Sequence, residues 1–180
     1  MPPPTLARHT LLAAFTVVAL LLLSWTTQPT IAAADGEDAS ESQQRGESRK
    51  EQIQSQIRGC VNRKRTHRGL PPLQAAGPLE EAASLHASSM SKHGFFDHVD
   101  PRGRDAGDRV AIFARKSRYL PIGENIGAGY RRAKAVCEAW MDSASHRANI
   151  LNPDFTVIGA GYATGGQYGS YFVQVFGRER

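Results

Sequence analysis

The chain has 180 residues, enough for one domain with short extensions, and a formal net charge of +5 at neutral pH. The charge is uneven, because residues 35–47 carry a net −4 whereas residues 48–180 carry a net +8. A basic surface favours anionic partners such as wall polymers or phospholipid head groups, although surplus Lys and Arg also serve simply to keep a domain soluble. The sequence has neither zinc-finger spacing nor a ribonucleoprotein motif, so we expect no nucleic-acid partner.

Residues 1–34 have the features of a signal peptide. The apolar run from Leu11 to Trp25 is shorter than the roughly 20 residues that a membrane-spanning helix needs. It is followed by the small residues Ala32 to Ala34, a pattern typical of signal-peptidase sites. We expect cleavage before Asp35, a secreted, periplasmic or envelope-associated product, and no stable membrane anchor afterwards. An uncleaved anchor is the alternative.

The next segment differs sharply in composition. Residues 35–50 are rich in Asp, Glu, Ser and Gln and contain almost nothing apolar. Such a segment buries too little surface to offset its ordering entropy, so we predict a disordered polar linker. The folded domain is expected to occupy residues 51–180, and we expect it to be a monomer.

Helical periodicity marks the first half of this domain. Ile53, Ile57 and Val61 recur at helical spacing, and this helix should stop before Gly69. A second helix is expected from Pro78 to Gly94, with His86 on its buried stripe. Further helices are predicted over residues 105–114 and 133–143.

Two β-rich segments end the chain. Val157 to Thr164 and Ser170 to Gly177 are separated by Gly165-Gly166, which predicts a terminal antiparallel β-hairpin. Helices first and a hairpin last indicate a layered α+β domain.

Cys60 and Cys137 are the only cysteines. In an oxidising compartment two cysteines favour one disulfide, which here would close a loop of 77 residues and contribute roughly 4 kcal/mol. Two buried free thiols are the alternative.

His98 and His146 each follow a predicted helix and lie next to polar residues, where side chains reach a shared cleft. His86, by contrast, is expected to be a hydrogen-bonded core residue, and His67 lies in a basic surface segment.

Four phrases occur in order along the chain: Phe96-Asp97-His98, Gly123-Glu124-Asn125-Ile126, the stretch Trp140 to Leu151, and Gln174-Val175-Phe176-Gly177. Together they resemble the CAP superfamily, which unites cysteine-rich secretory proteins, antigen 5 and the group-one pathogenesis-related proteins, and most of all its bacterial SCP-like extracellular branch. The resemblance covers about residues 53–178. It implies a three-layer α-β-α sandwich with a large cleft.

In animal and plant members of that superfamily the cleft holds two His and two Glu. His98 and Glu124 match one His and one Glu, whereas Ser143 and Tyr171 stand at the other two places. The bacterial branch uses His146 instead, and the resemblance therefore implies a reduced site of His98, Glu124 and His146. Further residues are expected to contact the ligand: Ser143, Asp142 and Asn125.

Several chemistries suit this trio. Two imidazoles, His98 and His146, with a carboxylate can hold a divalent metal such as zinc. The same groups can perform acid–base catalysis. Alternatively, they bond to each other and hold the loops together, with Arg109 at the cleft rim or in the scaffold.

The leading functional hypothesis is a binding module for a lipid, a glycan or another cell-envelope component, because eukaryotic members of the superfamily include lipid and sterol binders. A hydrolase acting on wall glycan or peptide is the first alternative, and a non-catalytic interaction scaffold is the second. Whether the protein is an enzyme stays open at this point.

Overall fold

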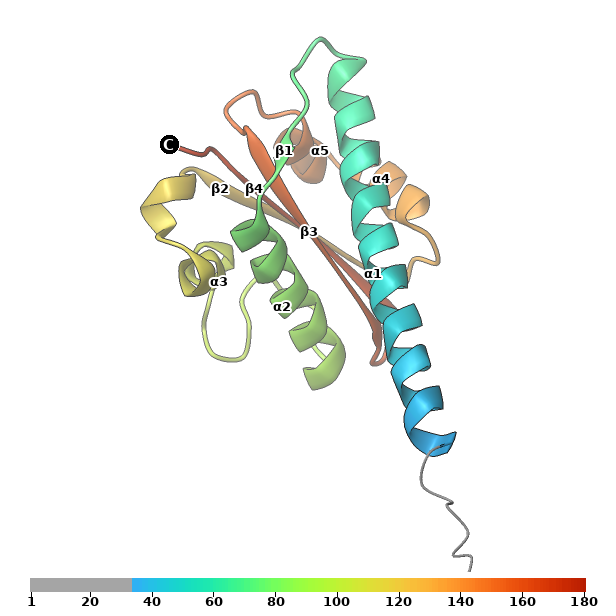
Figure 1. Ribbon diagram of the computed structural model, residues 1–180. Helices are drawn as coiled ribbons and strands as arrows, with labels where there is room; N and C mark the ends of the chain where they lie inside the picture. Colours follow the sequence, from blue (N-terminus) through green and yellow to red (C-terminus); the bar gives the residue numbers. More distant parts are fainter. Residues whose placement is uncertain (1–33) are drawn as a thin grey trace, which may run out of the picture.

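The computed structural model describes residues 34–180 (Figure 1). The predicted signal peptide lies outside this range except for Ala34. Within the described residues, no helix is both long enough and apolar enough to cross a membrane.

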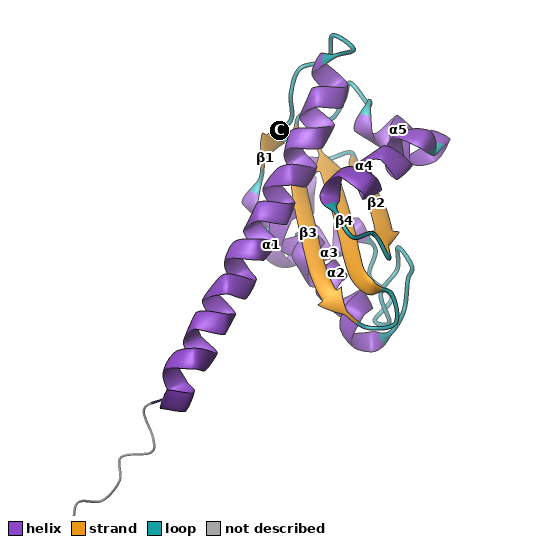
Figure 2. Ribbon diagram, turned by 90° about the vertical axis from the view of Figure 1, so that its right-hand side faces the viewer, coloured by secondary structure: helices purple, strands orange, loops and turns teal. Residues whose placement is uncertain are grey.

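The first helix, α1, runs without a break over Ala34–Thr66. Its first turns are exposed and project beyond the rest of the domain (Figure 2). The structure therefore has a helix where the sequence predicted a disordered linker over residues 35–50. The segment contains no proline and several good helix formers, and Arg45 pairs with Glu41 one turn away at 3.0 Å.

The remaining elements follow the predicted order with four additions. The predicted helices are α2 (Gly77–His93), α3 (Ala106–Phe113) and α4 (Ala133–Asp142). The predicted hairpin consists of β3 (Val157–Gly165) and β4 (Gly169–Gly177). The elements that the sequence did not indicate are β1 (Gln74–Ala75), a 3-10 turn η1 (Lys116–Tyr119), β2 (Ile122–Ala128) and α5 (Ala144–Ile150).

The strands form one four-stranded sheet in the order β1-β3-β4-β2. Strand β1 pairs in parallel with β3, and the β3–β4 and β4–β2 pairs are antiparallel. Helices α2 and α3 cover one face, and α1, α4 and α5 cover the other (Figures 1 and 2). The predicted α-β-α sandwich is confirmed.

Alternation along β4 explains why two separate cores form. Phe172 and Phe176 point toward α1, α4 and α5, whereas Val173 and Val175 point toward α2. On β3, a glycine occupies the position that faces the backbone of α2. A Cβ added at Gly159 would lie 2.1 Å from the backbone of Leu79, so helix and sheet pack at a distance that only glycine permits.

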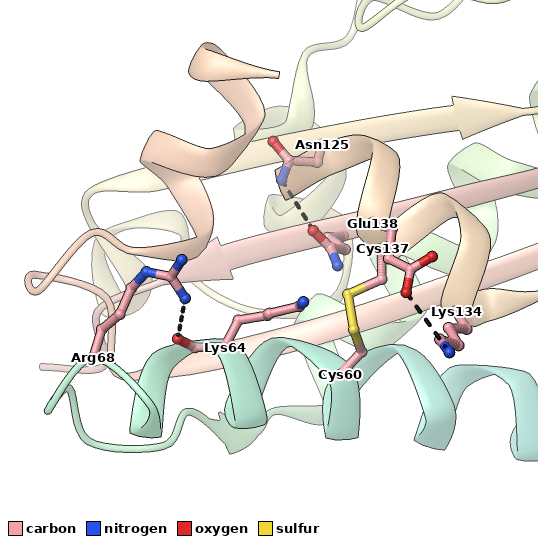
Figure 3. Close-up of a disulfide and its surroundings, with 8 residues drawn as sticks. Cys60, Lys64, Arg68, Asn125, Lys134, Cys137 and Glu138 are labelled. Atoms are coloured by element: carbon pink, nitrogen blue, oxygen red, sulfur yellow. Dashed lines mark hydrogen bonds and ion pairs between the residues drawn. A yellow bond between two sulfur atoms is a disulfide. The ribbon is translucent and has the colours of Figure 1, made fainter. Parts of the chain in front are cut away.

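Two helices of the other layer, α1 and α4, are covalently joined. Cys60 on α1 and Cys137 on α4 form a disulfide, as predicted (Figure 3). The alternative of free thiols is therefore wrong.

Arg65 reinforces this layer although nothing in the sequence singled it out. Its guanidinium is completely buried at the end of α1 and donates to the carbonyls of Pro71, Ile150, Asn152 and Phe155. It thereby ties α1 to the loop that follows α5.

Candidate functional site

The site is built around Glu124, which projects from β2 toward the layer of α2 and α3. Strand β2 lies at one edge of the sheet, with one helical layer on each of its faces. The Glu124 side chain is only 5% exposed, yet both of its oxygens have partners. Oε1 accepts from Nδ1 of His98 at 2.8 Å, and Oε2 accepts from Nη2 of Arg109 at 2.5 Å.

Arg109 is the buried cation of this centre. It lies on α3, which begins with a capping box between Asp105 and Asp108. Besides Glu124, its guanidinium donates to the carbonyls of His98 and Arg104. Of the two roles considered for Arg109, rim and scaffold, its complete burial supports the scaffold.

His86 of α2 lies behind this pair. Its Nε2 is 2.8 Å from the carbonyl oxygen of Asp97 and therefore donates the hydrogen bond, while Nδ1 has no partner. Burial lowers the pKa of His86 and outweighs the nearby charge of Glu124, so the ring is neutral at neutral pH. Its assignment as a core histidine is confirmed.

His98 differs in both exposure and charge. The loop after α2 leaves its side chain 53% exposed. The hydrogen bond to Glu124 raises the pKa of His98, because the carboxylate stabilises the protonated ring.

His146 sits on α5, beyond a break that separates this helix from α4. Ser143 ends α4 in an extended conformation, with φ −84° and ψ 125°, and α5 starts after it. Burial lowers the pKa of His146, and so does the positive charge of His98. The two imidazoles are therefore close enough to influence each other's charge.

Asn125 fixes the position of α5. It is fully buried, and its amide donates to the carbonyl of His146 and to Oε1 of Gln174. Its own oxygen accepts from Asn149. These bonds support a scaffold role for Asn125, and contact between Asn125 and a ligand stays a prediction. Arg147 has a similar role, because it donates to the carbonyl of Met141 and joins α5 to α4.

The trio is divided between two neighbouring hollows. His98 and Glu124 line a hollow of about 350 Å³ beside α3. His146 and Ser143 line a second hollow of about 340 Å³ beside α4, to which Asp142 contributes nothing. This second hollow, called the His146 hollow below, is walled mainly by apolar and aromatic residues: Phe96, Ile126, Gly127, Ala128, Tyr130, Ala139, Trp140 and Tyr168.

Phe96 and Tyr168 are functional candidates that sequence reasoning missed. Both rings are exposed, and their centroids lie 5.9 Å apart in an edge-to-face contact. Phe96 was read only as part of a motif, and Tyr168 lies in the turn between β3 and β4. The one signal in the sequence that could have pointed to Tyr168 was its position, as an aromatic residue in a glycine-rich turn.

The donor set does not fit a structural zinc site. Among residues 34–180, no three His, Cys, Asp or Glu side chains gather where they could hold a metal ion. Both oxygens of Glu124 are occupied, and the charge of Arg109 beside them disfavours a second cation. We therefore derive no chemistry from a metal at this site.

Comparison with known proteins places the chain in a family. A sequence model of the CAP family, described as the Cysteine-rich secretory protein family, matches residues 59–176. Two relatives from Bacillus subtilis are the uncharacterized protein YkwD, 38% identical over 116 residues, and the uncharacterized membrane protein YlbC, 32% identical over 108 residues. The matches cover 64% and 60% of this chain, but only 43% and 31% of the relatives.

Solved structures show the same arrangement. An extracellular SCP-domain protein from Bacillus anthracis is 28% identical with a TM-score of 0.64, over 72% of this chain and 41% of that one. An outer surface protein from Borrelia burgdorferi is 21% identical with a TM-score of 0.63, over 69% and 90% of the two chains, and shares the fold.

Proposed function

We propose, from the premise that this chain belongs to the CAP family, that it is an exported module whose His146 hollow binds a cell-envelope glycan. Export is supported by the solved neighbours, which are described as extracellular or outer-surface proteins. The predicted signal peptide agrees with it.

The observation that carries the proposal is the pair of exposed rings, Phe96 and Tyr168, beside the His146 hollow. Small-molecule sites are typically apolar hollows with a few placed polar groups. A sugar ring presents apolar C–H faces and a rim of hydroxyls, and it can lie against an aromatic ring while its hydroxyls bond to polar neighbours. A tyrosine also adds a hydroxyl to its apolar face.

The polar groups of this hollow suit hydroxyls better than charges. Because its pKa is lowered, His146 is neutral at neutral pH and offers one donor and one acceptor. The Ser143 hydroxyl adds a second group of the same kind, 3.3 Å from the hydroxyl of Ser145. Neutral donors and acceptors without a fixed charge match the hydroxyl and amide groups of a glycan.

A hydrolase acting on the same polymer has less support. A general acid or base must reach the reacting proton, and glycosidases place two carboxyl groups astride the bond. Glu124 has both oxygens engaged and little exposed surface. No second carboxylate lines either hollow except Asp105, which caps α3.

The proposal is tested by measuring binding to insoluble peptidoglycan in sedimentation assays and to soluble N-acetylglucosamine oligosaccharides by calorimetry. Tyr168→Ala should weaken binding roughly tenfold, since it removes one aromatic wall of the hollow. The matched control is Phe113→Ala, an exposed aromatic side chain far from this hollow in the sequence and absent from its lining.

Equal binding by wild type and Tyr168→Ala would refute the proposed site. Release of soluble sugar or peptide, abolished by Glu124→Gln, would replace the binding module with the hydrolase.

A further inference from the structure

A different hollow lies on the layer formed by α2 and α3, where Figure 1 shows the loop between these helices curving beside α2 and below α3. Its volume is about 500 Å³. It shares no residue with the His146 hollow. We call it the α2–α3 hollow, and its lining is: Leu85, Ser88, Ser89, Lys92, His93, Asp100, Pro101, Arg102, Arg104, Ile112 and Phe113.

Two large apolar side chains are exposed beside each other at the end of α3. Ile112 is 51% exposed and Phe113 is 40% exposed, although Val110 in the same helix is fully buried. Only three other large hydrophobic residues are exposed in the part of the chain that the structure describes. Adjacent exposed hydrophobics at the edge of a hollow mark a contact surface more often than isolated ones do.

The rim of this hollow is cationic. Lys92 and Arg102 are exposed, and within residues 34–180 neither side chain forms an ion pair. The one acid in the lining, Asp100, is buried and accepts from the guanidinium of Arg104 at 2.7 Å. This pairing lowers the pKa of Asp100 and neutralises its charge, which leaves Lys92 and Arg102 as the net charge of the rim.

We propose that the α2–α3 hollow docks on an anionic phospholipid surface. Ile112 and Phe113 enter the boundary between head groups and acyl chains, and Lys92 and Arg102 contact the phosphates. Apolar side chains flanked by cations are the usual composition of a surface that binds anionic membranes. A soluble polyanion would use the two cations and gain nothing from Ile112 and Phe113, so the charge and apolar groups together favour a lipid surface.

This inference does not depend on the glycan proposal, because the two hollows use different residues. Together they describe a module that holds a glycan at one surface while a second surface rests on lipid.

The experiment is co-sedimentation of purified residues 35–180, the chain after its predicted signal peptide, with two kinds of vesicle. One kind is phosphatidylcholine alone, and the other is an equal mixture of phosphatidylcholine and phosphatidylglycerol. We expect binding to the anionic vesicles only. The double variant Lys92→Gln/Arg102→Gln should weaken it roughly 25-fold, at about fivefold for each cation removed near the surface. Ile112→Ser/Phe113→Ser should weaken it about tenfold while leaving the melting temperature unchanged.

The matched controls separate this surface from general basicity. Arg131→Gln/Lys134→Gln removes two exposed cations near the start of α4, on the opposite layer, and should leave vesicle binding within twofold of wild type. Phe96→Ser removes an exposed ring of the His146 hollow and should also leave it unchanged. Equal losses in the charge variants, or full binding by Ile112→Ser/Phe113→Ser, would overturn the proposal in favour of non-specific attraction.

If the wild-type protein bound vesicles but not the glycan, the proposed function alone would be refuted. If it bound the glycan but not vesicles, the lipid surface alone would be refuted.

Discussion

The centre at Glu124 and the His146 hollow lie next to each other but have opposite properties. At Glu124 an ionised pair is buried, and its geometry is fixed by charged hydrogen bonds from His98 and Arg109. In the His146 hollow the walls are mainly apolar, the polar groups are neutral, and two aromatic rings are exposed. Buried charges thus fix the geometry at Glu124, whereas the exposed rings of Phe96 and Tyr168 leave a surface in the His146 hollow that solvent can reach.

The largest effect should come from removing the buried cation. Arg109→Met leaves the Glu124 carboxylate without its counter-charge in an almost fully buried position, so we expect the free energy of unfolding to fall by about 3–5 kcal/mol. Urea denaturation measures this loss. The double variant Arg109→Met/Glu124→Gln should recover part of it, because it removes the uncompensated charge as well. A loss below about 1 kcal/mol for the single variant, the range of surface pairs, would mean that the pair is not buried in solution.

The next effect concerns the link between the two regions. Asn125→Ala removes the amide that holds the His146 carbonyl and leaves Oε1 of Gln174 without that donor, while the side-chain amide of Asn149 keeps only its bond to the Glu124 carbonyl. We expect a loss of about 1–3 kcal/mol in unfolding free energy, together with weaker glycan binding because α5 loses its anchor. Gln56→Ala, at an exposed amide on α1, is the control for stability. Unchanged glycan binding by a folded Asn125→Ala variant would separate α5 from the site.

A smaller effect should appear as a dependence of stability on pH. Since the pKa of His98 is raised above its usual 6.5, the stability from its bond to Glu124 is fully present below that value. It is lost as the pH rises through the higher pKa of the folded state. Wild type should therefore lose stability relative to His98→Gln as the pH rises above 6.5, in a range where the lowered pKa of His146 keeps that ring neutral.

Parallel urea midpoints of wild type and His98→Gln across that pH range would show that the bond is absent in solution. The effect is small because half of the His98 side chain is exposed and solvent screens the pair.

The smallest effect on stability should come from the hollow itself. Tyr168→Ala removes an exposed ring in a turn and should change the free energy of unfolding by less than about 0.5 kcal/mol, even as it weakens glycan binding. Thermal unfolding checks this. A large destabilisation would assign Tyr168 to the fold, through its ring contact with the buried Tyr171.

Much of the fold followed from local pattern. Helical spacing, the glycine after α2 and the two β-rich segments at the end predicted the end of α1, together with α2, α4 and the hairpin, close to their observed bounds. The start of α1 was not predicted. Strand β2 was missed because Gly123-Glu124-Asn125-Ile126-Gly127 lacks an alternating apolar pattern. Its place in the sheet is fixed by pairing with β4.

The sequence by itself carried the resemblance to the CAP family, which implied the sandwich, and its two cysteines favoured the disulfide. It also made Glu124 a candidate site residue. The tertiary structure alone decided that Arg109 is the buried counter-ion, that Asn125 faces inward, and that Phe96 and Tyr168 come together across 72 residues. It also separated His146 from Glu124 into a different hollow. These facts depend on which layer covers each face of β2, and no periodicity within a single segment carries that information.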